Sequence, residues 1–168
     1  MDARIHTRHA VPGDAQALCA AERETSKTPG LLVSLPHEFS ESSFENKIAW
    51  LATAGVYLVA EMGGEMAGHA LLEPMPLRAT SHVFSLTIVV HPGHTGRGVG
   101  THLMHAVLHW AGRHPAVEKI ELRVRETNAV ARRLYQRFGF IEEGRFEKRL
   151  KLADGTYLAD ICMARFFV

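Results

Sequence analysis

The chain has 168 residues, of which 46% are hydrophobic and 22% are charged, and its formal net charge is +1. A chain of this length can bury roughly two-thirds of its unfolded surface. No linker, repeat or low-complexity segment divides it, so we expect a single domain over residues 1–168. The near-neutral charge argues against a protein that holds nucleic acid through a broad basic field.

The sequence shows no sign of a membrane or secretory segment. No apolar run is long enough to span a bilayer, and Met1 to Ala10 lacks the apolar core of a signal peptide. The two cysteines, Cys19 and Cys162, are isolated and lack metal-ligand spacing. We therefore expect reduced thiols in a cytoplasmic protein with no membrane partner.

The N-terminal part of the chain alternates regular segments with one long loop. The patterns predict, in chain order, a strand over Arg4–Arg8, a helix that begins at Gly13-Asp14, a loop over Lys27–Phe39, and a helix over about Ser42–Thr53 that begins with serines suited to capping. The first helix carries three apolar residues on one face: Ala17, Leu18 and Ala21.

Three strands follow these helices. Gly63-Gly64 favours a tight hairpin between strands over Val56–Met62 and Glu65–Leu72. The segment Glu73-Pro74-Met75-Pro76 ends the second strand. Val83–Val90 is nearly all apolar, as expected of a central strand that is covered on both faces.

The C-terminal part alternates helices and strands. The patterns predict a helix over about Gly98–Arg113, a strand over Glu118–Val124, a helix over Asn128–Phe138 that ends at Gly139, and a hairpin of Phe140–Leu152 and Thr156–Phe166 that turns at Asp154-Gly155. The full order, β-α-α-β-β-β-α-β-α-β-β, predicts an α/β fold in which a mixed sheet carries helices on both faces.

The most informative segment is Val90–Thr101, in which the apolar strand ends before Pro92 and a glycine-rich turn leads into a helix. Gly96, Gly98 and Gly100 let the backbone curl with its N–H groups exposed at the positive end of the helix dipole, which predicts a cradle for phosphate. A Cβ at Gly98 or Gly100 should block the approach of the ligand. The segment lacks the lysine of a nucleoside-triphosphate loop and the glycine spacing of the dinucleotide fingerprint.

The turn Thr95-Gly96-Arg97-Gly98-Val99-Gly100 resembles the acyl-CoA signature of the GCN5-related N-acetyltransferase (GNAT) superfamily, in which Gln or Arg precedes x-x-Gly-x-Gly/Ala. Thr95 departs from the signature because it stands where that long side chain is expected. Leu122–Phe140 resembles the family's later motif, a strand followed by Asn-x-x-Ala-x-x-Leu-Tyr-x-x-x-Gly-Phe.

The resemblance implies a single-domain, mostly antiparallel GNAT-like sheet. It also implies an enzyme that uses acetyl-CoA as cosubstrate, without a metal, and moves the acetyl group to a primary amine by direct attack in a ternary complex. The ending Tyr157–Arg165 resembles the last strand of small bacterial members that act on amino acids, small amines or protein N-termini. The oligomeric state is left open, and a homodimer is one of the alternatives. The alternative is a non-catalytic acyl-CoA-binding module or sensor, although a module that only binds needs no positioned acid.

The second motif supplies the candidate catalytic residue. On an ideal helix Asn128 and Tyr135 lie about 20° apart with Ala131 near the same stripe, which suits a slot for a narrow pantetheine arm. In the family, the matching Tyr protonates the CoA sulfur and the Asn bonds the cofactor, so the resemblance assigns these roles to Tyr135 and Asn128. The other interpretation of Tyr135 is a half-buried aromatic residue with a wet hydroxyl. The adjacent stripe should face the core: Val130, Leu134 and Phe138.

The cofactor site is expected to combine the cradle, this helix and the preceding strand, whose backbone holds the pantetheine in the family. The expected cofactor-binding residues are Ile88, Val89, Val90, Thr95, Gly96, Arg97, Gly98, Val99, Gly100, Thr101, Asn128 and Tyr135.

The sequence leaves the general base open. An α-amine, with a pKa of about 8, needs less help to lose its proton than a lysine-type amine with a pKa of about 10.4. Neither cysteine lies in a motif for an acyl-enzyme nucleophile. The candidates are two carboxylates and three residues that could order a water: Glu73, Glu126, Ser85, Thr87 and His82.

Three segments are free to form the acceptor site: Lys27–Phe39, Glu73–Thr80 and the turn near Asp154. Their charged and apolar residues suit a small amine or an amino acid, with a protein amine as another acceptor. Arg78 either pairs with an acceptor carboxylate or is a solvated loop residue. The apolar residues are Leu31, Leu32, Leu35, Phe39, Met75 and Leu77.

Three histidines, His102, His105 and His109, share one face of the helix after the cradle, which permits a metal hypothesis. No cysteine or carboxylate joins them at ligand spacing, and the apolar stripe lies opposite. A solvated face is the simpler interpretation.

Overall fold

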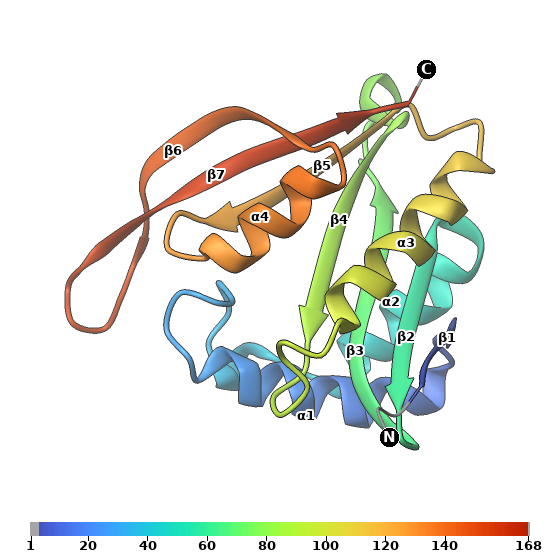
Figure 1. Ribbon diagram of the computed structural model, residues 1–168, viewed down its shortest axis with the longest axis horizontal. Helices are drawn as coiled ribbons and strands as arrows, with labels where there is room; N and C mark the ends of the chain where they lie inside the picture. Colours follow the sequence, from blue (N-terminus) through green and yellow to red (C-terminus); the bar gives the residue numbers. More distant parts are fainter. Residues whose placement is uncertain (1–3, 168) are drawn as a thin grey trace.

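The computed structural model describes residues 4–167 (Figure 1). Every strand and α-helix expected from the sequence is present, and the bounds differ from the expected ones by at most two residues. In chain order the elements are β1 (Ile5–His9), η1 (Pro12–Asp14), α1 (Ala15–Ser26), η2 (Pro36–Glu38), α2 (Glu41–Ala54), β2 (Val56–Met62), β3 (Glu65–Pro74), η3 (Arg78–Thr80), β4 (Val83–Val90), α3 (Val99–Gly112), β5 (Lys119–Arg125), α4 (Ala129–Arg137), β6 (Ile141–Lys151) and β7 (Tyr157–Phe166).

The seven strands form one sheet in the order β1-β2-β3-β4-β5-β7-β6. All neighbours are antiparallel except β4 and β5, which confirms the mixed, mostly antiparallel sheet. The parallel pairing covers only Val83–Ser85 against Lys119–Glu121. Beyond it, β4 continues along β3 and β5 continues along β7, so the two central strands diverge (Figure 1).

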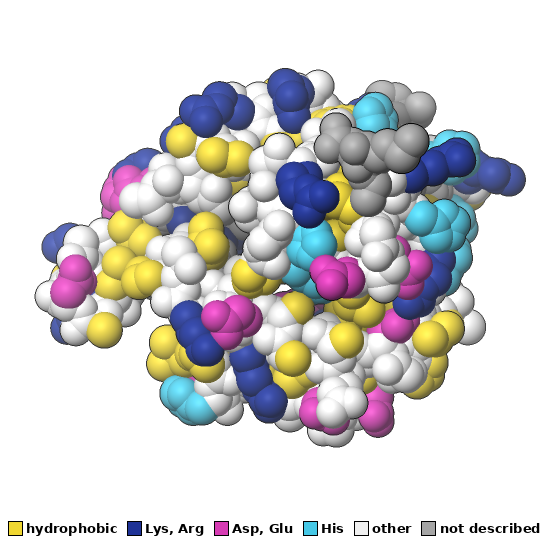
Figure 2. Space-filling model, turned by 60° about the horizontal axis from the view of Figure 1, so that its bottom comes forward, with side chains coloured by type: hydrophobic (Ala, Val, Ile, Leu, Met, Phe, Trp, Pro, Cys, Tyr) yellow, Lys and Arg dark blue, Asp and Glu magenta, His cyan; other side chains and the backbone are white. Residues whose placement is uncertain are grey.

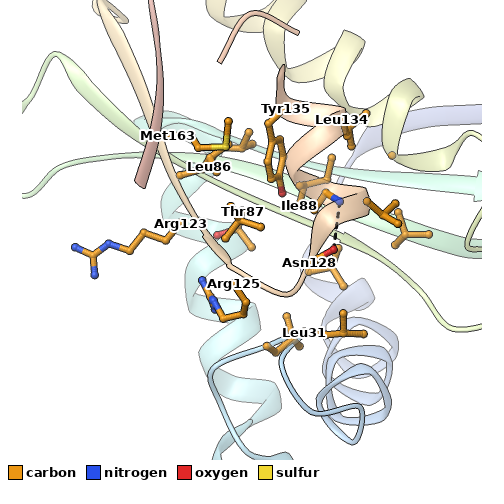
Figure 3. Close-up of a pocket in the computed structure, with 18 of the residues that line it drawn as sticks. Leu31, Leu86, Thr87, Ile88, Arg123, Arg125, Asn128, Leu134, Tyr135 and Met163 are labelled. Atoms are coloured by element: carbon orange, nitrogen blue, oxygen red, sulfur yellow. Dashed lines mark hydrogen bonds between the residues drawn. The ribbon is translucent and has the colours of Figure 1, made fainter. Parts of the chain in front are cut away.

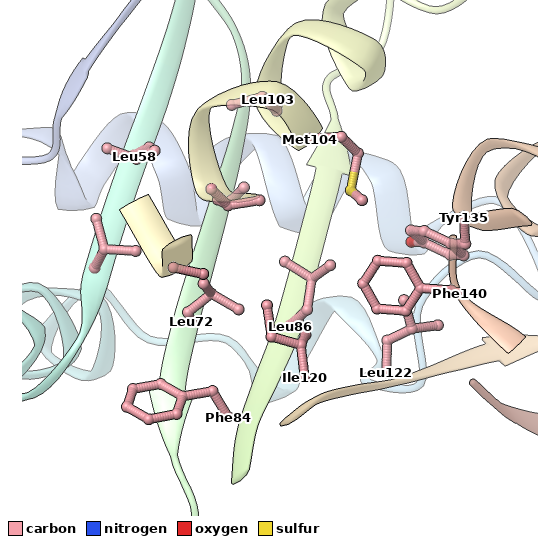
Figure 4. Packing of buried hydrophobic residues seen from close by; sticks show 14 of the residues in the cluster. Leu58, Leu72, Phe84, Leu86, Leu103, Met104, Ile120, Leu122, Tyr135 and Phe140 are labelled. Carbon is pink, nitrogen blue, oxygen red and sulfur yellow. The ribbon is translucent and has the colours of Figure 1, made fainter. Parts of the chain in front are cut away.

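Helices cover both faces of the sheet, as expected. On one face α1 and α2 pack on β2 and β3 through a cluster that includes Leu18, Ile48 and Val59. On the other face α3 and α4 pack on the central strands, where Leu103 and Met104 of α3 lie over Leu72 and Leu86 (Figure 4). Alternate residues of β4 therefore face opposite cores, since successive side chains of a strand point to opposite faces.

Local sequence signals set several element ends. Ser40 caps α2 by accepting a hydrogen bond from the Ser43 amide. Gly63-Gly64 closes the β2–β3 hairpin with Met62 paired to Glu65, and a similar turn joins β6 to β7 at Asp154-Gly155. No helix in the described range is long and apolar enough to cross a membrane.

Two expectations about buried faces are wrong. Ala17 is exposed, because α1 buries the side that carries Ala15, Leu18 and Cys19. Val130 is 72% exposed. The first turn of α4 lies over the opening between β4 and β5, where no strand is present to cover this side chain.

Candidate active site

A cavity of about 1140 Å³ occupies the opening between β4 and β5. It passes through the sheet, because its lining includes side chains from both faces. On the α3 and α4 face it is lined by Val99, Leu134 and Tyr135. On the α1 and α2 face it is lined by α1, the α1–α2 loop and polar residues of β4, β5 and β6.

The glycine-rich turn forms an open set of donors at one end of this cavity. Gly98 is the N-cap of α3 with a φ of +83°, and the His102 amide donates to its carbonyl at 3.0 Å. Within residues 4–167, no amide from Thr95 to Thr101 donates to a protein acceptor. Free amides at a helix N-terminus fit an anionic phosphate group.

The two glycines around the helix start are required for different reasons. The positive φ of Gly98 disfavours any residue with a Cβ, and a Cβ built there meets only Ile5 Cδ1 at 4.0 Å. A Cβ on Gly100 would lie 3.2 Å from Leu134 Cδ2 and 3.5 Å from Val90 Cγ2. Gly100 therefore lets α3 pack closely against Leu134 of α4.

All of the expected cofactor-binding residues except Arg97 line the cavity. Arg97 is exposed in the turn. A different arginine lies beside the cradle: Arg137, from the end of α4, donates to Thr101 Oγ1 at 3.2 Å and lines the cavity. The structure thus provides a long cationic side chain near the turn in which Thr95 departs from the acyl-CoA signature.

The last residues of β4 serve two purposes at once. Ile88, Val89 and Val90 lie beyond the pairing with β5, and all three line the cavity. Val89 is buried, while Ile88 and Val90 pack against the large core. Their side chains fill the interior, and the edge of the strand that faces the opening has no neighbouring strand.

Tyr135 projects from α4 into the cavity (Figure 3). The residue is 7% exposed and its ring lies 6.0 Å from that of Phe140. Burial raises the pKa of the phenol, so the hydroxyl keeps its proton at neutral pH. No group in the described part of the chain hydrogen-bonds to this hydroxyl.

Asn128 also lines the cavity and caps α4, because its Oδ1 accepts from the Ala131 amide at 3.2 Å (Figure 3). This capping role was not predicted from the sequence. The side-chain amide retains its NH₂ donors.

The opposite side of the cavity is rich in arginine. Arg125 Nε lies 2.5 Å from Asp160 Oδ1, and both side chains are less than a tenth exposed. Arg123 and Arg149 lie 5.0 and 5.8 Å from the ring centre of Phe146. No carboxylate of residues 4–167 lies within 4.0 Å of either guanidinium.

The fold places some of the candidate bases in the cavity lining and others outside it. Glu73 is engaged by Lys47, whose Nζ lies 3.0 Å from both carboxylate oxygens, and Glu73 does not line the cavity. The Glu126 carboxylate accepts a hydrogen bond from the Ala159 amide and so joins β5 to β7. This bond and the contact with Arg145 lower the pKa of Glu126. His82 is exposed at the start of β4, outside the cavity. Ser85 and Thr87 line it.

The segments expected around the acceptor contribute unequally. Leu31, Leu32, Phe39 and Met75 line the cavity. Leu35, Leu77 and the turn near Asp154 do not, and Arg78 is exposed in η3 outside the lining. The solvated-loop interpretation of Arg78 therefore describes it better, because η3 precedes the start of β4 whereas the cradle follows its end.

A buried chain of hydrogen-bonding side chains was not predicted from the sequence. Glu22 Oε1 lies 2.7 Å from His69 Nε2, and His69 Nδ1 lies 2.8 Å from His91 Nε2. His91 Nδ1 lies 3.3 Å from the Met66 carbonyl oxygen. His69 has no exposed surface, and Glu22 lines the cavity. The one signal in the sequence was a histidine within the apolar run of β3.

The three histidines of α3 are exposed, in agreement with a solvated face. Residues 4–167 contain no group of three His, Cys, Asp or Glu side chains that could hold a metal ion. Mixed charges also characterise the face in Figure 2, where basic, acidic and histidine side chains lie interspersed.

Comparisons with known proteins agree with this fold. Residues 21–140 match the acetyltransferase (GNAT) family. The L-amino acid N-acetyltransferase AaaT of Escherichia coli is 30% identical over 165 residues, which are 96% of this chain and 97% of that protein.

Solved structures with low sequence identity share the fold. The acetyltransferase of the GNAT family from Streptococcus pneumoniae is 23% identical and superposes with a TM-score of 0.89 over 98% of this chain and 100% of that one. The phosphinothricin acetyltransferase from Sinorhizobium meliloti, solved in complex with acetyl-CoA, is 18% identical with a TM-score of 0.88 over 97% and 88% of the two chains. The chain belongs to the GNAT family and is an N-acetyltransferase that uses acetyl-CoA.

Proposed function

We propose that this enzyme transfers the acetyl group of acetyl-CoA to the α-amine of an amino acid. The observation that carries the proposal is the pair of guanidiniums, Arg123 and Arg149, on the acceptor side of the cavity. They lie beside Phe146 and no carboxylate of residues 4–167 neutralises them. An amino acid carries a carboxylate that such a pair binds well. The name of the E. coli relative, an L-amino acid N-acetyltransferase, supports the same acceptor class.

Acetyl-CoA would enter from the α3 and α4 face. The free amides of Gly96 to Thr101 would hold the pyrophosphate, with Arg137 as a nearby cation. The unpaired edge of Ile88–Val90 and the NH₂ group of Asn128 would hold the pantetheine arm. This arrangement would direct the thioester through the sheet toward the arginines.

Tyr135 is the proposed general acid. The amine attacks the thioester carbonyl directly, the new C–N bond forms, and the C–S bond breaks. The departing sulfur takes the phenolic proton of Tyr135, which burial keeps in place at neutral pH, and the proton that the amide nitrogen loses restores the phenol. The amide product and CoA thiol then leave.

An acceptor panel with labelled acetyl-CoA tests the acceptor class. We expect turnover of free amino acids to exceed that of the matching amino-acid amides, which keep the amine but lack the carboxylate. Arg149→Gln should raise the KM for the best amino acid roughly 10- to 100-fold, the usual range for a hydrogen bond to a charged group. The KM for acetyl-CoA should stay unchanged.

Arg78→Gln is the matched control, because Arg78 is an arginine outside the cavity. It should leave both KM values unchanged. Equal turnover of amino acids and their amides, or equal effects of the two substitutions, would contradict an amino-acid acceptor.

A further inference from the structure

The hydrogen-bonded chain of Glu22, His69 and His91 joins the cavity to the buried interior between α1 and the sheet. None of the bases expected from the sequence belongs to it. We propose that Glu22 binds the acceptor ammonium and takes its proton, and that His69 and His91 hold the Glu22 carboxylate in position. The inference rests on the proposed transfer to an amine, whichever amine the enzyme prefers.

The Glu22 carboxylate has one oxygen committed and one available. Oε1 faces His69 Nε2 at 2.7 Å, while the side chain is 13% exposed and lines the cavity. No Lys or Arg of residues 4–167 lies within 4.0 Å of it. A carboxylate at a cavity wall with no Lys or Arg beside it can bind a substrate ammonium.

The two histidines fix the direction of the hydrogen bonds. Burial lowers the pKa of His91 to about 3, so this ring is neutral and has a single N–H. The Met66 carbonyl can only accept, so His91 donates this N–H from Nδ1, and its Nε2 accepts from His69 Nδ1 at 2.8 Å. One proton then lies between His69 Nε2 and Glu22 Oε1, which are 2.7 Å apart, so the hydrogen bonds orient the Glu22 carboxylate.

The hydrogen-bonded side chains of Glu22, His69 and His91 lie beside β4, where they suit a role in binding the acceptor amine. His69 is paired with Val89 in the β3–β4 register, and both side chains lie on the α1 face of the sheet. Thr87 lies two residues away along the same face, about 6.6 Å by strand geometry, and lines the cavity. Glu22 and Thr87 therefore line the same cavity, in which an acceptor amine would lie.

The protons balance over one turnover. The ammonium gives one proton to the Glu22 carboxylate, which becomes a carboxylic acid, and the neutral amine attacks the thioester. As the C–S bond breaks, the second proton leaves nitrogen and replaces the one that Tyr135 gives to sulfur. Glu22 returns its proton to solvent when the products leave, so the net reaction releases one proton.

Several titratable groups face this chain. Tyr57 of β2 stacks on His69 with 5.8 Å between ring centres, and burial raises its pKa. Cys19 lies one turn before Glu22 on α1, and burial raises its pKa as well. His94 adds repulsion on the His91 side, and Glu65 lies 3.8 Å from His94. The raised groups stay neutral near pH 7, so neither adds a negative charge beside Glu22.

Glu22→Gln tests the proposal, because the amide can still accept from His69 but cannot take a proton. At pH 7 we expect kcat/KM for the acceptor to fall roughly 100- to 10,000-fold, the usual contribution of a general base. The Kd for acetyl-CoA, measured by calorimetry, should not change. The loss should shrink as pH rises through the pKa of the acceptor amine, because more of the amine is then already neutral.

Glu24→Gln is the matched control, since Glu24 lies on the same helix, is exposed, and pairs only with Lys27 in the described structure. His69→Gln, which removes the positioning donor, should lower kcat/KM with the same pH dependence and less severely. If Glu22→Gln does not fold, Glu22→Asp, which withdraws the carboxylate by one methylene, should give the same pH-dependent loss.

The assay uses whichever amine the wild-type enzyme acetylates fastest. A wild-type enzyme that prefers another amine to amino acids would therefore contradict the proposed acceptor while Glu22 is still tested. Turnover by Glu22→Gln within about threefold of the wild type, or a loss that is equal at all pH values, would overturn the role of Glu22.

Discussion

The two sides of the opening between β4 and β5 are built from different kinds of group. On the α3 and α4 side the residues that line the cavity present backbone amides and mostly apolar side chains, joined by polar residues that include Thr101, Asn128, Tyr135 and Arg137. On the other side charged side chains from α1, β5, β6 and β7 lie beside apolar residues of the α1–α2 loop. Under the proposed function the first side would hold acetyl-CoA and the second would hold the acceptor.

The difference affects how each side depends on the fold. A cradle of backbone donors needs only the local turn and the start of a helix. The arginine-rich side contains a buried guanidinium, Arg125, which needs a counter-ion. Asp160 supplies it, and the pair forms part of the cavity wall. Substitutions can separate these two requirements.

The largest expected effect is on stability, from breaking that buried pair. Asp160→Asn keeps the shape of the side chain but leaves the Arg125 guanidinium without its counter-ion in the interior. The free energy of unfolding should fall by about 3–5 kcal/mol, the usual cost of breaking a buried ion pair. Denaturant unfolding monitored by circular dichroism measures this.

Glu142→Gln provides the comparison for that experiment. It breaks the more exposed contact between Arg132 and Glu142, at 3.6 Å, and should cost less than about 1 kcal/mol. Similar losses of unfolding free energy from the two substitutions would show that burial does not make the Arg125–Asp160 pair more stabilising than an exposed pair.

Tyr135→Phe tests the proposed general acid, which lies where the two sides of the cavity meet. It keeps the ring and removes the proton, so kcat should fall roughly 10- to 1,000-fold with little change in the Kd for acetyl-CoA. The free energy of unfolding should be unchanged, since no described residue bonds to the hydroxyl. Steady-state kinetics and calorimetry give the two numbers.

Tyr157→Phe makes the same chemical change at a tyrosine that is 45% exposed in β7, and it should not affect kcat. Near-normal turnover by Tyr135→Phe would mean that water or another group protonates the sulfur.

The smallest of these effects is expected at the cradle. Gly98→Val puts a β-branched residue at a φ of +83°, a strain of about 1–3 kcal/mol that the turn relieves by moving its amides. The Kd for acetyl-CoA should rise roughly 10- to 100-fold, while Gly112→Ala, with nothing within 4 Å of the added Cβ, should not change it. Unchanged affinity in folded Gly98→Val would remove the turn from the cofactor site.

Patterns that involve neighbouring residues determined most of the fold. The alternation of apolar strands and amphipathic helices, with turns at Gly63-Gly64 and Asp154-Gly155, placed every strand and α-helix. The glycine turn before α3 and the motif around Tyr135 are continuous in the chain, so their positions at the turn and on the helix were predictable from spacing and resemblance. Local geometry, meaning backbone torsions and helix periodicity, is encoded within a few residues of each position.

Only the tertiary structure decided which distant side chains meet. Glu22, His69 and His91 come from α1, β3 and the end of β4, and nothing in their spacing links them. Arg137 reaches the cradle only because α4 packs beside α3, and Val130 is exposed because α4 spans an opening instead of a strand. Charged and polar groups become a site when strand pairing and helix packing bring them within hydrogen-bond distance, and that pairing depends on the whole sheet.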